Sequence, residues 1–522
     1  MNPVRRTRLP RFSLPFLFAI FVAEAVYFLL YGRFNIDEGM HLNAGRLIYE
    51  AGLHLYRDFP FSQGPGGPYF YGAASALFGT SLGVGRSLSL LVSVTGVGAL
   101  AWFASRRVGM AGGALVLLWT LVNFPALWEF TQIRTEAPSV SLALIASIAW
   151  FHRKGSALRW ALAPCLLVWA TSFRLTYAIP LAVVCLLIAL ELRHEPRTLL
   201  RAAAIVAVNG VVAALPMLAY PEESFFHVFV AQASRAERLQ WSHMPFSARF
   251  WFFARPESGF WAIGMASVVP VALVVGRWRR GWRPRLSRSD DPATTLLVLF
   301  AMAGLTYLPL LFFKVGFFQY FVNASLLLTA AIAIAVPIVA RESPRRRAWV
   351  IGAVSAAWVF AAITSLRTID TWVDPKRPTI GRLAALRGEL QRLTPGGCTM
   401  MTFETHLAVE TGCHVMRGLE YSYFSFFPDL PPAEARARGV LNRRMLLDRL
   451  GRDLPEYVAL TPRAVEQITG TTSPKHQPPV LGVMRGHYRH LTTVIVPVGP
   501  IYTFWNKVHI YARSDLRDDY SM

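Results

Sequence analysis

Two adjacent carboxylates, Asp37 and Glu38, follow the first apolar segment of the chain, where the chain would leave a membrane. A carboxylate at such a boundary can remove the proton of a hydroxyl or amine group, which is general-base catalysis. The structural alternative is that both acids only stabilise the first turn of a helix from Gly39 to Glu50, an effect of about 0.3 to 1 kcal/mol. We expect Asp37 to be catalytic, and for Glu38 both interpretations stay open.

A third carboxylate, Glu136, lies at the outer end of the third apolar segment, two residues before Pro138. Proline suits the first turn of a helix, so Glu136 could merely cap the fourth segment. The functional alternative is that Glu136 faces Asp37 and forms with it a site for a sugar or a divalent cation. A divalent metal ion bound by Asp37 and Glu136 is therefore an open cofactor assignment.

Cationic and polar residues recur at the same level of the expected membrane. Arg174 lies at an outer turn between two short apolar segments, and placing an arginine near lipid costs about 2.5 to 3.5 kcal/mol unless it is compensated. We expect it to pair with an anion; the alternative is that its head group reaches the outer surface. Lys314 lies at the outer turn between two other spans, and Gln319 and Tyr320 inside the span after it are polar groups that would need partners. The set that would suit a phosphate is Arg174, Lys314, Arg134, Tyr320 and Gln319.

The first outer loop, residues 33–86, is rich in polar and aromatic side chains. Beside the two acids, six of its residues are candidates for contacts to a sugar or to an acceptor. These are His41, Arg57, Asp58, Gln63, Tyr69 and Tyr71.

The composition predicts the elements that position these groups. Apolar residues make up 54% of the 522 residues and the mean hydropathy is +0.37. Apolar runs of the length needed to cross a bilayer recur up to residue 366, which indicates a polytopic α-helical membrane protein. We expect about eleven transmembrane helices, at residues 13–32, 87–104, 110–127, 137–151, 160–173, 175–192, 202–219, 259–276, 293–312, 317–340 and 348–366.

The distribution of basic residues predicts the orientation. With the N-terminus in the cytoplasm, the cytoplasmic segments hold 22 Lys and Arg in 57 residues, as the positive-inside rule requires. The net charge of +22 is mostly this signal, so we expect no nucleic-acid partner. An odd number of spans then places residues 367–522 outside a bacterial cytoplasmic (inner) membrane.

Residues 367–522 are long enough for an extracytoplasmic α/β domain beyond the transmembrane domain of residues 1–366. We expect helices at 380–393, from Thr405 and at 432–450, and strands at 398–403, 414–416, 457–460, 491–498 and 502–512. Cys398 and Cys413 fall at the ends of neighbouring strands, so a disulfide is an open alternative to two free thiols.

In their order and depth, the first-loop acids, Glu136, the Arg174 turn and the turn from Lys314 to Tyr320 resemble the GT-C superfamily of polytopic glycosyltransferases. The resemblance covers roughly residues 13–366. The nearest branch is family 39 and its relatives, which include protein O-mannosyltransferases, lipid A aminoarabinose transferases and lipopolysaccharide-core galacturonosyltransferases.

The resemblance implies transfer of a sugar from a polyprenyl-phosphate donor to an envelope glycan, lipid or protein acceptor on the outer side of the membrane. It implies that Asp37 acts as base or orients the acceptor, and that Glu136 helps to build the site, sometimes through a metal. Family members often have a lysine and two prolines where this chain has Gln63, Gly64 and Pro65. Arg174 and Lys314 would then carry more of the phosphate binding.

Two other classes of protein remain as alternatives. A transporter or flippase of lipid-linked sugars would also need charges in the membrane, but usually near its midplane and within inverted repeats. Here the charges gather at one face. A non-catalytic scaffold for envelope assembly would use the outer domain to bind a partner.

Overall fold

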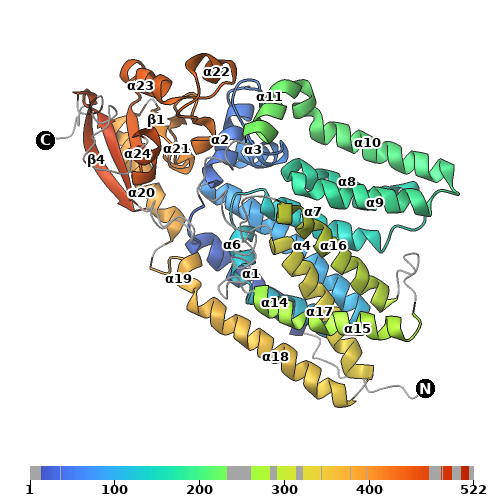
Figure 1. Cartoon of the computed structure of the whole chain (residues 1–522). Helices are drawn as coiled ribbons and strands as arrows, with labels where there is room; N and C mark the ends of the chain where they lie inside the picture. The colour runs from blue at the N-terminus through green and yellow to red at the C-terminus, as the bar shows by residue number, and fades with distance from the viewer. Residues whose placement is uncertain are drawn as a thin grey trace.

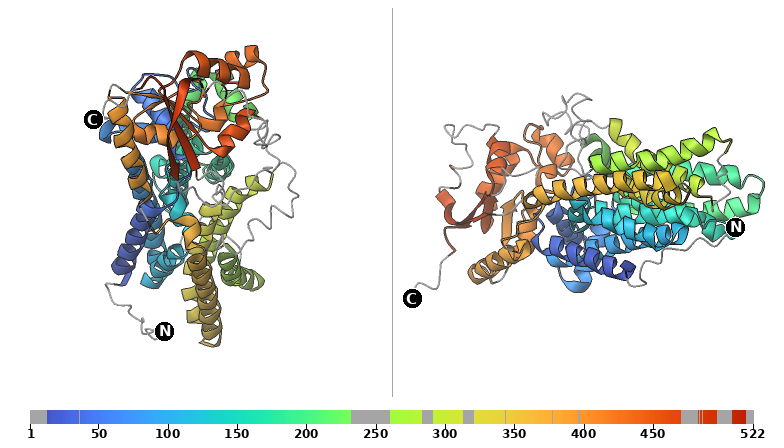
Figure 2. Two further views of the ribbon diagram at one scale, coloured as in Figure 1. Left: turned by 90° about the vertical axis from the view of Figure 1, so that its left-hand side faces the viewer. Right: turned by 90° about the horizontal axis from the view of Figure 1, so that it is seen from below.

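The computed structural model describes residues 13–35, 37–231, 260–282, 291–312, 321–342, 344–376, 378–395, 397–469, 482, 484, 486–495 and 507–516. A bundle of long helices makes up most of the molecule, and a smaller unit containing a β-sheet packs on one end of it (Figure 1). The two further views show the same arrangement, with the sheet unit beyond one end of the bundle (Figure 2).

The long helices identify a multi-pass membrane protein. Six helices in the described residues are long and apolar enough to cross a membrane, within 13–31, 82–108, 196–219, 261–279, 322–341 and 347–367. The helices of the bundle are α1 (Ser13–Tyr31), α4 (Leu82–Val108), α5 (Met110–Leu121), α6 (Phe124–Phe130), α7 (Glu136–Trp150), α8 (Ala157–Phe173), α9 (Ala178–Glu191), α10 (Pro196–Ala219), α14 (Phe260–Ala266), α15 (Val268–Arg279), α16 (Pro292–Phe312), α17 (Val322–Glu342) and α18 (Pro344–Arg367).

All eleven expected spans fall on apolar helices, but they are not eleven straight crossings. The third one bends by 84° between α5 and α6, so it counts as a broken span or a re-entrant pair. The break is encoded locally, since the side chain of Asn123 accepts a hydrogen bond from the backbone N–H of Ala126 and so starts a new helix. Three other expected spans lie on apolar helices shorter than 18 residues, α7, α8 and α9.

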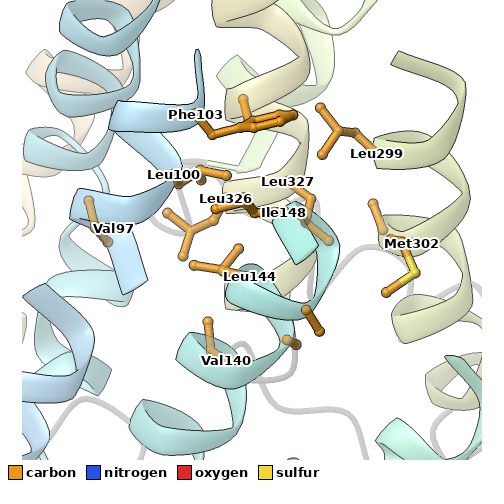
Figure 3. Close-up of a cluster of buried hydrophobic side chains, with 14 of the residues drawn as sticks. Val97, Leu100, Phe103, Val140, Leu144, Ile148, Leu299, Met302, Leu326 and Leu327 are labelled. Atoms are coloured by element: carbon orange, nitrogen blue, oxygen red, sulfur yellow. The ribbon is translucent and has the colours of Figure 1, made fainter. Parts of the chain in front are cut away.

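The centre of the bundle is apolar and tightly buried. Figure 3 shows side chains of α4, α7, α16 and α17 meeting between these helices. Val97, Leu100, Leu144, Leu326 and Leu327 among them have no solvent exposure. This packing fixes α4 and α7, whose N-terminal ends carry Arg86 and Glu136, charged residues of the site.

Two short helices form most of the first outer loop. Helix α2 (Glu38–Tyr49) begins one residue earlier than expected, and α3 (Gly66–Phe78) was not expected because its start reads as a turn of glycines and prolines. A Cβ on Gly45 would lie 2.5 Å from the Cα of Gly72, so the two helices cross at van der Waals contact through glycine.

The smaller unit is built on a five-stranded mixed sheet of order β2-β1-β3-β5-β4. Its strands are β1 (Thr399–Thr402), β2 (His414–Val415), β3 (Tyr457–Leu460), β4 (Tyr488–Ile495) and β5 (Lys507–Arg513). The strands β2, β1 and β3 are parallel, and β5 joins antiparallel both to β3 and to β4. Its helices are α20 (Thr379–Leu393), α21 (Thr405–Thr411), α22 (Pro432–Ala437), α23 (Arg443–Arg452) and α24 (Pro462–Thr469).

The expected helix at 432–450 is wrong as a single element. It divides into α22 and α23 because Gly439 has a φ of 65°, and because the side chain of Asn442 caps the new helix at the N–H of Met445. The last two strands are offset from their expected positions, and parts of the expected ranges lie outside the described residues. Helix α24 was not expected.

The sheet unit is joined to the first outer loop by polar contacts. The side-chain amide of Asn43 donates to the carbonyl of Glu420 at 2.9 Å, and Arg46 donates to the carbonyl of Cys413 at 2.8 Å. The ring of Tyr421 packs against that of Phe61 with 4.4 Å between centroids. The first loop and the sheet unit therefore form one continuous structure at this end of the bundle.

The two cysteines of the sheet unit form a disulfide, Cys398–Cys413, which joins the start of β1 to the residue before β2. This resolves the alternative that the sequence left open. The linkage closes a chain separation of 15 residues.

We predict that the double substitution Cys398→Ser with Cys413→Ser lowers the stability of the sheet unit by about 3 kcal/mol, since a cross-link of this loop length restricts the unfolded chain by that amount. Hydrogen exchange of β1 and β2 as a function of urea measures the effect. Replacing the free Cys165 and Cys185 is the control. A peptide map without reductant that shows both 398 and 413 as free thiols would contradict the assignment.

Candidate active site

Arg134 is the centre of a charge cluster at the end of the bundle near the sheet unit. Its guanidinium lies 3.2 Å from a carboxylate oxygen of Asp37, 3.1 Å from one of Glu129 and 3.3 Å from one of Glu136. The side chain of Arg134 is only 7% exposed. An arginine has five N–H donors in a planar fork, which is why a single one can hold several carboxylates.

A second arginine completes the cluster. Arg174 forms an ion pair with Glu136, so the anion that it was expected to need is supplied at least in part by the protein. Arg174 follows α8 in an extended conformation, with φ of −150° and ψ of 111°, which directs the chain away from the helix at this level. With an exposed fraction of 18%, its side chain is the most open of the five in the cluster.

The local structure favours a chemical role for Asp37 over a capping role. Asp37 occupies the N-cap position of α2, but its side chain makes no capping hydrogen bond. It reaches Arg134 instead. Glu136 likewise lies in the first turn of α7, and its carboxylate is engaged by Arg134, Arg174 and the hydroxyl of Thr135. Both acids are thus directed into the cluster.

Glu38 lies in a different environment from its neighbour Asp37. Its carboxylate forms a two-pronged pair with Arg86 at 2.6 and 2.7 Å, and both side chains are completely buried. The carboxylate also accepts from the N–H groups of Asn35 and Ile133. All these partners are protein groups that join α2, α4 and the turn before α7, which favours a structural role.

Three first-loop candidates lie close to the cluster. Tyr71 donates a 2.7 Å hydrogen bond to the backbone carbonyl of Arg134 and so supports its position. His41 is buried, its Nδ1 has no hydrogen-bond partner, and burial lowers the pKa of His41 to about 3, so its ring is neutral. Gln63 accepts from Tyr56 through its backbone carbonyl, while its side-chain oxygen is buried without a partner.

The other three first-loop candidates lie elsewhere. Arg57 and Asp58 form an exposed ion pair at 2.8 Å, and Arg57 also contacts the ring of Tyr220. Tyr69 packs edge to face with Tyr49. The structure therefore brings Arg57, Asp58 and Tyr69 to an aromatic rim of the loop, with partners outside the Arg134 cluster.

The glycine-rich stretch of the loop lies against the Arg174 turn. A Cβ on Gly64 would lie 2.1 Å from the backbone oxygen of Ser172, so only glycine allows this approach. A Cβ on Gly67 would lie 2.6 Å from Nδ1 of His41. Gln63 therefore precedes Gly64, which touches Ser172, two residues before Arg174.

The remaining phosphate candidates, Lys314, Gln319 and Tyr320, lie outside the described residues. Two acids near the described site were missed by sequence reasoning. Glu129 is fully buried and pairs with Arg134; a carboxylate inside an apolar helix was the signal that could have identified it. Glu404 comes from the sheet unit and interacts electrostatically with Asp37, a proximity for which the sequence holds no signal.

The charge cluster does not fit a shared metal ion. The guanidinium of Arg134 lies against both Asp37 and Glu136, so these carboxylates already have a cation between them. Among the described residues, no group of three or more His, Cys, Asp or Glu side chains is arranged to hold a metal. We therefore derive no chemical step through a metal.

The site combines a proton acceptor with a cation, and both are only partly exposed to solvent. Asp37 is a carboxylate 13% exposed that can accept a proton, and Arg174 is a cation that can meet an incoming anion. Fixed charges in such a site act strongly because little water screens them.

We predict that Glu38→Gln destabilises the protein, because it leaves the buried guanidinium of Arg86 without its carboxylate. Removing one partner of a buried pair costs about 3 to 5 kcal/mol. The loss of stability is measured as a lower thermal unfolding temperature of the purified protein in detergent. Glu50→Gln, an exposed change in the same loop, is the control. Normal unfolding would instead argue for a chemical role of Glu38.

No protein-family model and no curated protein sequence matches the chain. Solved structures do. ArnT from Cupriavidus metallidurans in the apo state superimposes with a TM-score of 0.56 at 14% identity, over 94% of this chain and 97% of that one. The same protein bound to undecaprenyl phosphate gives 0.54 at 14% identity, over 95% and 98%. The chain therefore has the fold of ArnT, and the expected architecture, a polytopic helical bundle with a small sheet unit, is confirmed.

Proposed function

We propose that the protein is an inverting glycosyltransferase that moves a hexosyl or pentosyl group from a polyprenyl-phosphate donor to a hydroxyl or amine acceptor. The observation that carries this proposal is the cluster in which Arg134 and Arg174 hold Asp37 and Glu136 at one end of an ArnT-like bundle. The neighbouring structure with bound undecaprenyl phosphate supports a lipid phosphate as the ligand class.

In the proposed reaction, an acceptor oxygen or nitrogen attacks C1 of the sugar while the bond from C1 to the phosphate oxygen breaks. The electron pair of that bond leaves with the polyprenyl phosphate, and the proton of the acceptor passes to the carboxylate of Asp37. General-base catalysis of this kind contributes about 10²- to 10⁴-fold. The attack occurs opposite the leaving phosphate, so the configuration at C1 inverts.

Arg174 is the side chain that we assign to the donor phosphate. Its partner Glu136 is also held by Arg134, so Glu136 keeps a cationic partner when Arg174 turns to a phosphate. A phosphate competes well for an arginine because the planar fork matches its oxygens. The charge of Arg174 lies at the turn that Gly64 touches. Gly64 follows Gln63, the position where members of the GT-C family that the chain resembles often have a lysine.

We propose that this site lies on the outer side of a bacterial inner membrane, with residues 367–522 as an extracytoplasmic domain. Two features support the orientation. The disulfide Cys398–Cys413 belongs to the sheet unit, and disulfides persist in oxidising compartments. The segments richest in lysine and arginine are the loops expected on the cytoplasmic side, opposite to the sheet unit, as the positive-inside rule requires.

Asp37→Asn is expected to abolish sugar transfer, since the amide cannot take the proton of the acceptor. Radiolabelled sugar transfer from a polyprenyl-phosphate donor extract to membranes measures this, and size-exclusion chromatography verifies that the variant still folds. Asp448→Asn, an exposed change of the same type on α23, should leave transfer unchanged. Transfer at wild-type rate by Asp37→Asn would remove Asp37 as the base.

Arg174→Ala is expected to weaken the binding of undecaprenyl phosphate by about 10- to 100-fold, the usual loss for a hydrogen bond to a charged group. Binding to the purified protein in detergent is the measurement, so no acceptor or sugar is needed. Arg159→Ala, at the other end of the same helix α8 and exposed, is the matched control. Equal affinity in both variants would exclude Arg174 from the phosphate site.

A further inference from the structure

The segment between the two cysteines of the disulfide reaches from the sheet unit to the start of α2. It contains β1, a turn at Phe403 and Glu404, and helix α21. A Cβ on Gly39 would lie 1.9 Å from the backbone nitrogen of His406, so the two backbones touch at this point. The ring of Phe34 stacks on that of His406 at 5.4 Å and 21°. The disulfide-closed segment 398–413 is thus fixed against the residues that flank Asp37.

Glu404 is the carboxylate that this segment brings to the site. It is 2% exposed, and one of its oxygens accepts a 3.0 Å hydrogen bond from the hydroxyl of Tyr423. The other oxygen is buried, has no hydrogen-bond partner in the described part of the chain, and lies 3.7 Å from Nδ1 of His406. Both ring nitrogens of His406 also lack hydrogen-bond partners. A half-satisfied buried carboxyl group is costly and calls for an explanation beyond packing.

Among the described residues, Glu404 has no arginine or lysine as an ion-pair partner, in contrast to Asp37 and Glu136. The groups that face it are Asp37 from the start of α2, His406 from α21 and Tyr423 from the turn that follows β2. Further out, Arg86 acts on His406 and Arg463 acts on Tyr423. Asp37 is the acid that acts electrostatically on Glu404.

We propose that Glu404 is a positioning residue for the transfer reaction: its charge, delivered from the sheet unit, strengthens Asp37 as the proton acceptor. The inference rests on the proposed function, because it assigns a partner to the base of that reaction. Arg134 lowers the basicity of Asp37 by stabilising its charged form, and a second negative charge close by opposes that effect.

The titration of Glu404 is consistent with this role. Burial, together with the charge of Asp37, raises the pKa of Glu404 to about 7. Below that pH Glu404 is neutral and leaves Asp37 a weaker base; above it Glu404 is charged and makes Asp37 a stronger one. Burial lowers the pKa of His406 to about 3, so His406 stays neutral across this range and does not cancel the effect.

The test compares Glu404→Gln with two matched variants. Glutamine keeps the acceptor for Tyr423 and the volume of the side chain but never carries a charge. Glu410→Gln removes a buried carboxylate from the same α21, where it accepts from the N–H of Leu82 and interacts with Arg86 and Arg387. Glu404→Asp keeps the charge. Thermal unfolding of each variant in detergent verifies the fold.

In the expected result, kcat for transfer by Glu404→Gln falls about three- to tenfold at pH 8 with little change in KM for the donor, because the neighbouring charge that supports the base is lost. At pH 6 the difference from wild type shrinks towards none. Glu404→Asp regains part of the loss, and Glu410→Gln keeps the wild-type pH profile.

An infrared titration of the purified wild-type protein between pH 6 and 8 provides a readout independent of activity. A protonated-carboxyl component with a midpoint near pH 7 should disappear over this range, and this component alone should be missing from the titration of Glu404→Gln. Active wild type with no such band, or a Glu404→Gln variant that follows the wild-type pH profile, overturns the inference and leaves the proposed function intact. Wild-type protein without any transfer activity overturns both.

Discussion

The site depends on one buried guanidinium. Three carboxylates, on Asp37, Glu129 and Glu136, gather within ion-pair distance of Arg134, and without a cation between them their repulsion and desolvation would keep them apart. Arg134 also holds the turn between α6 and α7 through its own backbone carbonyl, which accepts from Tyr71. One residue thus joins the first outer loop to the broken third span, and the other parts of the site are arranged around this junction.

Two neighbouring acids show how the environment separates roles that the sequence leaves equal. Glu38 is fully buried and both of its oxygens are occupied by Arg86 and by backbone N–H groups, whereas Asp37 shares Arg134 with two other acids and keeps some exposure. A carboxylate placed like that of Glu38 has no free position for a substrate. A carboxylate placed like that of Asp37 can exchange partners, because Arg134 still pairs with Glu129 and Glu136 when Asp37 moves.

The parts of the structure that the sequence predicts are those set by local patterns. Apolar runs locate the membrane helices, and alternating patterns locate most of the tail strands, since hydrophobic periodicity reports secondary structure directly. Charged residues near apolar segments are unusual, and this pattern identified Arg134, Glu136 and Arg174 as site residues. The helix α3 was missed because glycines and prolines at its start favour a turn locally, and packing against α2 overrides this preference. Glu404 was missed because its position depends on docking, and no pattern in one sequence reports a contact between such distant segments.

The contacts between α2 and the tail join residues that are far apart in the chain: Asn43 and Glu420, which share a hydrogen bond, are separated by 377 positions. Ribosomal synthesis produces them in that order, so the surroundings of Asp37 are incomplete until the tail that carries Glu420 has been made. Until then Asn43 and Arg46 lack their partners in the tail, and Gly39 has no backbone against it. Completion of the site is therefore a late event, which follows synthesis of every helix in the bundle.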